Sequence, residues 1–212
     1  MSSGPHGQAD LSAILVSRIC HDLVSPIGAI VNGVDLVREL GGSDVDAELA
    51  MISQSSDRAS ALLKYYRVAF GTAGDDSAIS RSALREQATS FLASSRIVIE
   101  WPGDDGPALS RPVARLLLLL LMCARGLAGM RGVLSVQLPP EAEMPIGIRI
   151  DGAFSPDAPE MLAHLTGDAA GAEVTSRLVE FPLSRFYAAD LGAELMIEQG
   201  EGTVAIRVSR PA

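Results

Sequence analysis

The sequence predicts an α+β fold, with an N-terminal helical hairpin over residues 1–74 and a C-terminal α/β sandwich over residues 75–212. Three observations lead to this prediction. Apolar residues recur at helical spacing in the N-terminal third of the chain, the polar stretch "GTAGDDSAIS" follows at 71–80, and short strand patterns then alternate with helical ones. Because aromatic residues make up only 4% of the chain, the core must be built from aliphatic side chains.

The hairpin is predicted from two helical patterns and the turn between them. The first runs from Asp10 to Leu40 and is followed by Gly41 and Gly42, the residue type that helix C-termini favour. Ser43 can cap a second helix that extends to about Phe70. Two helices joined by so few residues are expected to lie antiparallel.

Each of these helices carries an apolar stripe of its own. A lone hairpin cannot bury both stripes, whereas two copies that pair into a four-helix bundle can, so we expect a homodimer. The stripe residues are Val16, Ile19, Leu23, Ile27, Ile30, Val34 and Val37 on the first helix, and Leu49, Ile52, Ala59, Leu62, Tyr66 and Phe70 on the second.

After the polar linker, the pattern changes to a mixed sheet with helices. Helices are predicted over about 81–94, 110–129 and within 157–190, and strands over 96–101, 132–138, 146–151, 193–199 and 202–208. The most apolar run, Val113–Met122, is about half of the ~20 residues that a membrane span needs. It is therefore expected to be a buried core helix.

Charge and cysteine content narrow the classes of partner. A net charge of -9 argues against binding to nucleic acid or to an anionic membrane, since either would repel the chain. Cys20 and Cys123 lie far apart without metal-ligand spacing, so neither a disulfide framework nor a metal site is expected. The N-terminal residues do not resemble a signal peptide, which makes the cytoplasm the expected location.

One histidine stands out in "RICHDLVSPIGAI", residues 18–30. His21 lies roughly 160° around the helix from the centre of the apolar stripe, so it should point to solvent. The other residues on its face are mostly small and polar, which would let another protein approach closely, and one of them is apolar and suits a docking contact. They are Asp10, Ile14, Ser17, Ser25, Gly28 and Asn32.

The neighbours of His21 favour a chemical role. A neutral imidazole is a competent nucleophile toward phosphorus, and Asp22 could hold its Nδ1 proton so that Nε2 attacks. Pro26 removes a helical hydrogen bond one turn later, at a cost of about 3 kcal/mol that suggests a local purpose. An exposed histidine is nevertheless often just solvated. Arg18 has two open interpretations, a contact to acidic groups of a partner or a solvated helix arginine.

The segment "HDLVSP" resembles the H-box of histidine kinases, and "RICHDLVSPIGAIVNGVDLV" resembles ChpT-type histidine phosphotransferases, dimeric relays of bacterial cell-cycle signalling. The resemblance covers the whole chain and implies a second domain similar to the kinase ATP-binding module. Three departures separate it from that module. Leu119 and Cys123 stand where asparagines are expected, "DGAFS" at 151–155 lacks the second glycine, and "SRLVEFPLSRFYAADLG" at 176–192 has no glycine-rich lid.

These departures predict a second domain that binds no ATP and a chain without a cofactor of its own. The resemblance then implies a relay in which His21 takes a phosphoryl group from the receiver domain of a hybrid kinase and passes it to response regulators. Mg²⁺ is expected in the partner receiver. The position of Ser25 is one that the kinase family often uses in dephosphorylation. Two alternatives stay open, an ATP-binding histidine kinase core and a non-catalytic dimeric adaptor.

Overall fold

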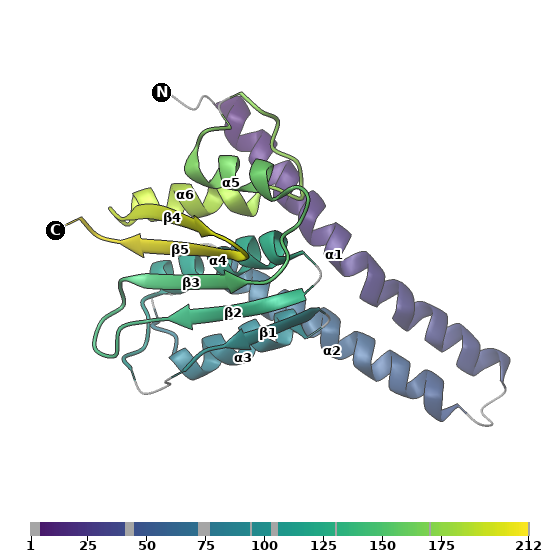
Figure 1. Ribbon diagram of the computed structural model, residues 1–212. Coiled ribbons are helices and arrows are strands. Elements are labelled where there is room, and N and C mark those ends of the chain that lie inside the picture. The colour runs from purple at the N-terminus through teal and green to yellow at the C-terminus, as the bar shows by residue number, and fades with distance from the viewer. Residues whose placement is uncertain are drawn as a thin grey trace.

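The structure is a computed structural model that describes residues 5–40, 45–71, 77–93, 95–102, 106–129, 131–169 and 171–211. Two long helices, α1 and α2, form the hairpin, and an α+β domain follows, as predicted (Figure 1). The helices are α1 Pro5–Glu39, α2 Asp46–Ala69, α3 Arg81–Leu92, α4 Arg111–Ala128, α5 Ala158–Thr166 and α6 Glu180–Asp190. The strands are β1 Arg96–Glu100, β2 Arg131–Gln137, β3 Ile146–Asp151, β4 Glu194–Gly200 and β5 Thr203–Ser209.

The sheet is mixed and is covered by helices on one face. Its strand order is β1-β2-β3-β5-β4, in which β1 pairs with β2 in parallel and the other neighbours are antiparallel. The side chains of Leu134, Ile148 and Ile206 face the helices and are buried, whereas Val98 and Met196 remain exposed. This alternation produces the predicted two-layer sandwich.

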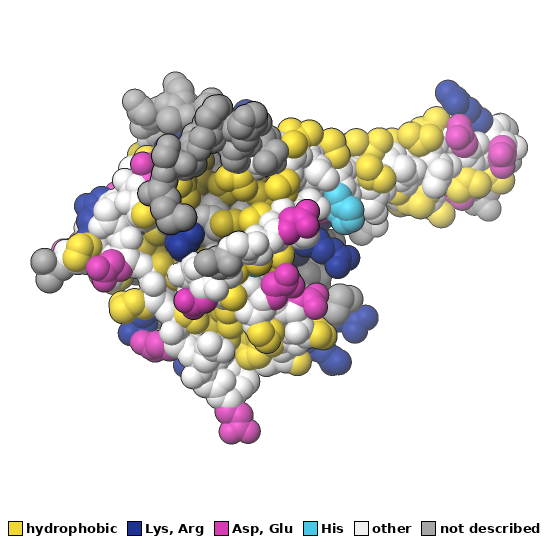
Figure 2. Space-filling view, turned by 90° about the horizontal axis from the view of Figure 1, so that it is seen from above, with side chains coloured by type: hydrophobic (Ala, Val, Ile, Leu, Met, Phe, Trp, Pro, Cys, Tyr) yellow, Lys and Arg dark blue, Asp and Glu magenta, His cyan; other side chains and the backbone are white. Residues whose placement is uncertain are grey.

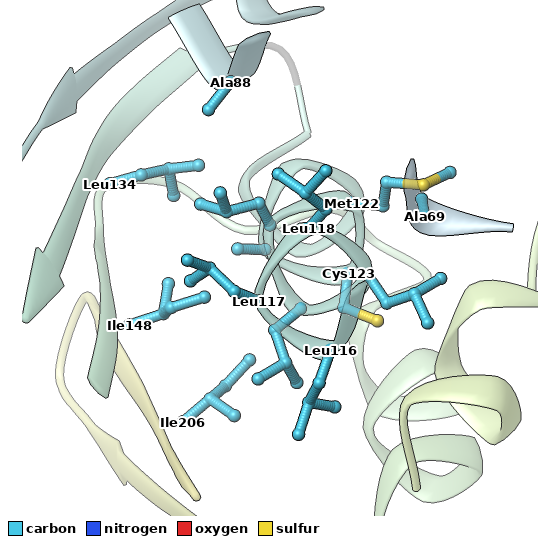
Figure 3. Packing of buried hydrophobic residues seen from close by; sticks show 14 of the residues in the cluster. Ala69, Ala88, Leu116, Leu117, Leu118, Met122, Cys123, Leu134, Ile148 and Ile206 are labelled. Carbon is cyan, nitrogen blue, oxygen red and sulfur yellow. The ribbon is translucent and has the colours of Figure 1, made fainter. Parts of the chain in front are cut away.

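Helix α4 forms the centre of the core. Its leucines 116–121 are completely buried, which confirms the prediction of a core helix. Figure 3 shows α4 with Leu134, Ile148 and Ile206 of the sheet on one side, Ala88 of α3 on another and Ala69 of α2 on a third. A helix surrounded in this way is apolar around most of its circumference.

The C-terminal half of α2 belongs to the same core. Leu62, Tyr65 and Tyr66 are buried there, and the Tyr65 ring stacks on Phe91 of α3 with 4.1 Å between ring centroids. The Tyr65 hydroxyl also donates a hydrogen bond of 2.6 Å to the carbonyl of Leu118 in α4. The base of the hairpin is therefore fixed inside the second domain, while its far end projects away (Figure 1).

In the projecting part, α1 and α2 pack on only one side of the predicted apolar stripe. Pro26 and Gly33 are buried, but Ile27 of the stripe is exposed, together with Val24 and Val31 nearby; Val16 of the stripe, nearer the N-terminus, is exposed too. Figure 2 shows hydrophobic side chains along the length of this arm. The hairpin thus covers the stripe only in part.

Two details of the hairpin differ from the predictions or lie beyond them. The predicted cap Ser43 and the glycines at 41 and 42 lie outside the described residues; α2 begins at Asp46, and its N-cap Val45 makes no side-chain capping bond. By length and composition alone, the stretch Leu11–Glu39 is also long and apolar enough to cross a membrane.

Candidate active site

The site is centred on His21, near the middle of α1. Its side chain is 75% exposed, which confirms the predicted orientation toward solvent. Because Ile19 and Leu23, on either side of this point, pack against the hydrophobic core, the imidazole is presented on an anchored stretch of helix.

The Asp22 carboxylate uses its two oxygens for different partners. Oδ1 lies 3.2 Å from His21 Nδ1, the pairing expected from the sequence. Oδ2 accepts hydrogen bonds from Arg18 Nε at 3.1 Å and from the Tyr66 hydroxyl. Burial would raise the pKa of Asp22, but the Arg18 charge and the hydrogen bonds from Tyr66, His21 and Arg18 outweigh it and hold that pKa below its usual value. The carboxylate is therefore ionised and oriented.

Arg18 does not occupy the partner-binding position that the sequence suggested. Its side chain is only 15% exposed, and Nη1 lies 3.4 Å from Glu180 Oε1 and 3.3 Å from the Ser176 carbonyl. Neither of the two open interpretations holds, because α6 and the segment before it cover this side of α1. Arg18 instead connects the hairpin to the second domain.

The remaining predicted partner-binding residues lie mostly where the helical wheel places them. Ser17, Ser25 and Asn32 are exposed, and a Cβ atom added to Gly28 would meet nothing within 4 Å. Ile14 is half-buried rather than exposed. The surface beside His21 is thus open and has small side chains.

A cleft of about 620 Å³ opens beside His21, between the hairpin and the second domain. The sequence did not indicate its two arginines. Arg58 donates a hydrogen bond of 2.7 Å to the Phe91 carbonyl, and Arg125 lies over the Phe91 ring at 4.7 Å from its centroid. The other lining residues are Asp22, Ser25, Pro26, Ala29, Gln54, Ser55, Asp57, Ala61, Ser90 and Ala93.

Tyr66 and Glu180 were also missed as parts of the site. The sequence placed Tyr66 on an apolar stripe, and its ring is indeed buried, but its hydroxyl reaches Asp22. Glu180 lies in the segment 176–192 that stands where a glycine-rich lid was expected. A charged residue inside an otherwise apolar pattern was the available signal for Glu180, yet it gave no indication of its partner.

The positions that correspond to nucleotide-binding motifs have other neighbours. Leu119 and Cys123 are completely buried in the core. Asp151 accepts hydrogen bonds from Arg149 Nε at 2.9 and 3.0 Å and from the Thr203 hydroxyl at 2.7 Å. Within the part of the chain that the structure describes, no three His, Cys, Asp or Glu side chains gather in a way that could hold a metal ion.

The fold and the site together define a class of protein: a helical hairpin that presents an exposed histidine–aspartate pair, joined to an α+β domain. Comparisons agree with this class. Residues 81–203 match the family model of the histidine phosphotransferase C-terminal domain, which is more than half of the chain. The chain therefore belongs to the histidine phosphotransferase family.

Individual relatives extend the comparison. The protein phosphotransferase ChpT of Brucella abortus (strain 2308) is 40% identical over 130 residues, which span 61% of this chain and 61% of that relative. A bacterial phosphotransferase solved at 1.7 Å has a TM-score of 0.79 and 28% identity, covering 99% of this chain and 98% of its own. A histidine kinase domain from Erythrobacter litoralis EL346 has a TM-score of 0.41 and 18% identity over 96% of this chain and 93% of its own.

Proposed function

We propose that this protein is a phosphorelay phosphotransferase that carries a phosphoryl group on His21 between the aspartates of two receiver domains. The observation that carries the proposal is the exposed His21 imidazole, whose Nδ1 lies 3.2 Å from the Asp22 carboxylate. When Nδ1 bears the proton, Nε2 keeps its lone pair for attack. Family membership supports the same assignment.

The proposed reaction balances without a cofactor in this chain. His21 Nε2 forms a bond to phosphorus while the bond between phosphorus and the donor aspartate breaks, so that the aspartate leaves as a carboxylate. The acceptor aspartate then attacks the phosphohistidine, and Nε2 leaves with its lone pair restored. The receiver is expected to supply Mg²⁺ and a lysine for the transferring group, and the hairpin contributes a positioned nucleophile.

Two features favour a relay over an ATP-dependent kinase. Leu119 and Cys123, which replace the expected asparagines, are buried in the core. Their side chains offer no oxygen or nitrogen ligand to the metal ion that accompanies nucleotide phosphates. Asp151, which would read adenine in a kinase, is engaged by Arg149 and Thr203. We infer that the second domain acts as a structural and docking module.

We further propose that the protein works as a homodimer in the cytoplasm, with hybrid-kinase receivers as donors and response regulators as acceptors. The exposed apolar residues of the arm support a second copy as the occupant of that face. A membrane is a poorer occupant because the apolar stretch carries Arg18, His21 and Asp22 near its middle. A role in cell-cycle control is carried only by the resemblance to ChpT-type relays.

A labelled-phosphate transfer assay tests the function. The purified protein is incubated with radiolabelled ATP alone and then with a phosphorylated receiver, as wild type and as His21→Ala, with circular dichroism to confirm folding. A receiver whose phosphorylated aspartate is changed to asparagine serves as the control. We expect label from the receiver only, and only when His21 is present.

The other outcomes each point to a different protein. Label taken directly from ATP would identify a kinase and contradict our interpretation of the second domain. If no receiver transferred label, and the wild type and His21→Ala bound receivers equally well, the protein would be a non-catalytic adaptor. Label that survives in His21→Ala would place the phosphoryl group on another residue.

A further inference from the structure

A continuous set of polar contacts joins the second domain to the nucleophile. Glu180, at the start of α6, pairs with Arg18 on α1, and Arg18 pairs in turn with Asp22, one turn further along the same helix. Asp22 reaches His21 Nδ1 through its other oxygen. A residue of the second domain is thus three contacts away from the imidazole.

The contacts among Glu180, Arg18 and Asp22 join specific atoms and are largely shielded from water. The Glu180 side chain is 2% exposed, and the same Arg18 guanidinium contacts Glu180 through Nη1 and Asp22 through Nε. Tyr66 donates to the Asp22 oxygen that Arg18 also contacts. Because both donors occupy Oδ2, Oδ1 is the oxygen that remains for His21.

Such support is needed because of the helix geometry. Side chains at adjacent positions diverge on a helix, so Asp22 can reach His21 Nδ1 only in a restricted rotamer. The donors Arg18 and Tyr66 approach from α1 and α2, and Glu180 holds the far end of Arg18. Together they remove the rotamer freedom that Asp22 would otherwise have.

We propose that Glu180, Arg18 and Tyr66 are positioning residues that hold the Asp22 carboxylate so that His21 carries its proton on Nδ1 and exposes Nε2 as the nucleophile. The proposal rests on the proposed function of His21 and deepens it. It also gives the second domain a role in the chemistry, since α6 supplies Glu180. The segment 176–192, which stands where a nucleotide lid was expected, then helps to orient His21 through Glu180.

The experiment measures the His21 tautomer directly. The full-length protein is labelled with ¹⁵N-histidine, and long-range ¹H–¹⁵N NMR spectra report which ring nitrogen bears the proton above pH 8. The His21 signals are those that disappear in His21→Ala. The tautomer is compared in the wild type, Glu180→Leu, Glu180→Gln and Tyr66→Phe.

We expect the Nδ1–H form to dominate in the wild type and its ratio to the Nε2–H form to fall by about threefold or more in Glu180→Leu and Tyr66→Phe. Glu180→Gln should retain most of the wild-type ratio, because an amide oxygen can still accept from Arg18 Nη1. Ser184→Ala is the matched control. Ser184 is also buried on α6, but its hydroxyl bonds to the Glu180 backbone carbonyl at 2.8 Å and lies 3.4 Å from Cys123 Sγ on α4, so its hydrogen bonds are to α6 and α4.

The outcomes separate this proposal from the function on which it rests. A tautomer ratio unchanged in folded Glu180→Leu and Tyr66→Phe, or changed equally in Ser184→Ala, would overturn the positioning role even if His21 relays phosphate. If the wild type accepted no phosphate from any receiver, the relay would fail while the NMR result still decided the positioning. Should Glu180→Leu not fold, Tyr66→Phe carries the same test from the other side of Asp22.

Discussion

At the residue scale, the central feature is that the two oxygens of Asp22 have separate tasks. Oδ2 binds Arg18 and Tyr66, and Oδ1 faces His21 Nδ1. A substitution that removes the charge of Asp22 but keeps its shape should therefore change the tautomer of His21 more than the stability of the fold.

Asp22→Asn is expected to lower the rate of His21 phosphorylation by at least about 10-fold, because the amide can present an N–H to Nδ1 and favour the wrong tautomer. The rate is measured from a phosphorylated receiver at a fixed concentration. Asp35→Asn is the control, since Asp35 pairs with Arg38 on an exposed part of the same helix. Equal rates in both variants would show that the Asp22 charge has no part in the reaction.

The raised pKa of Glu180 predicts how the free energy of unfolding changes with pH. Burial raises the pKa of Glu180 from 4.5 to about 7, while the Arg18 charge lowers it in part. Between these two values the folded state binds more protons than the unfolded state, so the free energy of unfolding falls as pH rises from about 4.5 to 7. The groups that influence this carboxyl are Arg18 and Asp22 on α1, Arg125 and Cys123 on α4, and Tyr65 on α2.

Urea unfolding at intervals from pH 5 to pH 8 checks this expectation. The stability of the wild type relative to Glu180→Gln should decline over that range by a few kcal/mol, because glutamine does not titrate. Asp22 does not interfere, since its lowered pKa affects stability only in more acidic solution. A difference that stays constant with pH would mean that Glu180 is ionised throughout.

The sequence predicted part of this site and missed the rest for a physical reason. His21, Asp22 and the small residues of their face are neighbours on one helix, so helical periodicity alone places them correctly. Arg18 lies on that helix too, but what it contacts is set by α6, far along the chain. Tyr66 falls on an apolar stripe in the sequence, and its ring is indeed buried. The sequence does not show that its hydroxyl reaches Asp22.

At the scale of elements, most helices and strands end close to where periodicity predicts, although α1 begins at Pro5 rather than at Asp10. The buried leucine-rich helix was clear from its composition. The close approach of α1 and α2 was not predictable, because a glycine in a helix indicates small size but not a neighbour. A Cβ atom added to Gly33 would lie 2.6 Å from Ile52 Cγ1. Gly28, on the open face, has no such neighbour.

Gly33→Ala is therefore expected to lower the free energy of unfolding by about 1–3 kcal/mol, since the Ile52 side chain or the helices would have to shift to admit the methyl group. Gly28→Ala is the matched substitution and should raise stability by about 0.5–1 kcal/mol through helix propensity. Both values come from thermal and urea unfolding. If the two variants changed stability in the same direction, the close packing at Gly33 would not limit the hairpin.

At the scale of the whole molecule, α1 leaves apolar side chains exposed, among them Val24, Ile27 and Val31 on the projecting arm and Val16 nearer the N-terminus. We predict that Ile27→Asp converts a dimer to a monomer in sedimentation equilibrium, because a charge would be buried in the bundle core. Val98→Asp, on the open face of the sheet, is the control and should leave the dimer intact.

Two results would contradict the dimer. A monomeric wild type would leave the exposed stripe without its proposed partner. Flotation of the wild type with lipid vesicles, abolished by Ile27→Asp, would instead assign the apolar face of α1 to a membrane.

The anchoring of Tyr65 between Phe91 and Leu118 bears on kinetics. Since the base of the hairpin lies inside the core of the second domain, that domain cannot swing across His21 to expose one surface to donors and a different one to acceptors. In the proposed relay, donor and acceptor receivers would then use the same face in turn. Phosphate transfer should follow ping-pong kinetics, and an excess of unphosphorylated acceptor should inhibit loading of the histidine by competition with the donor.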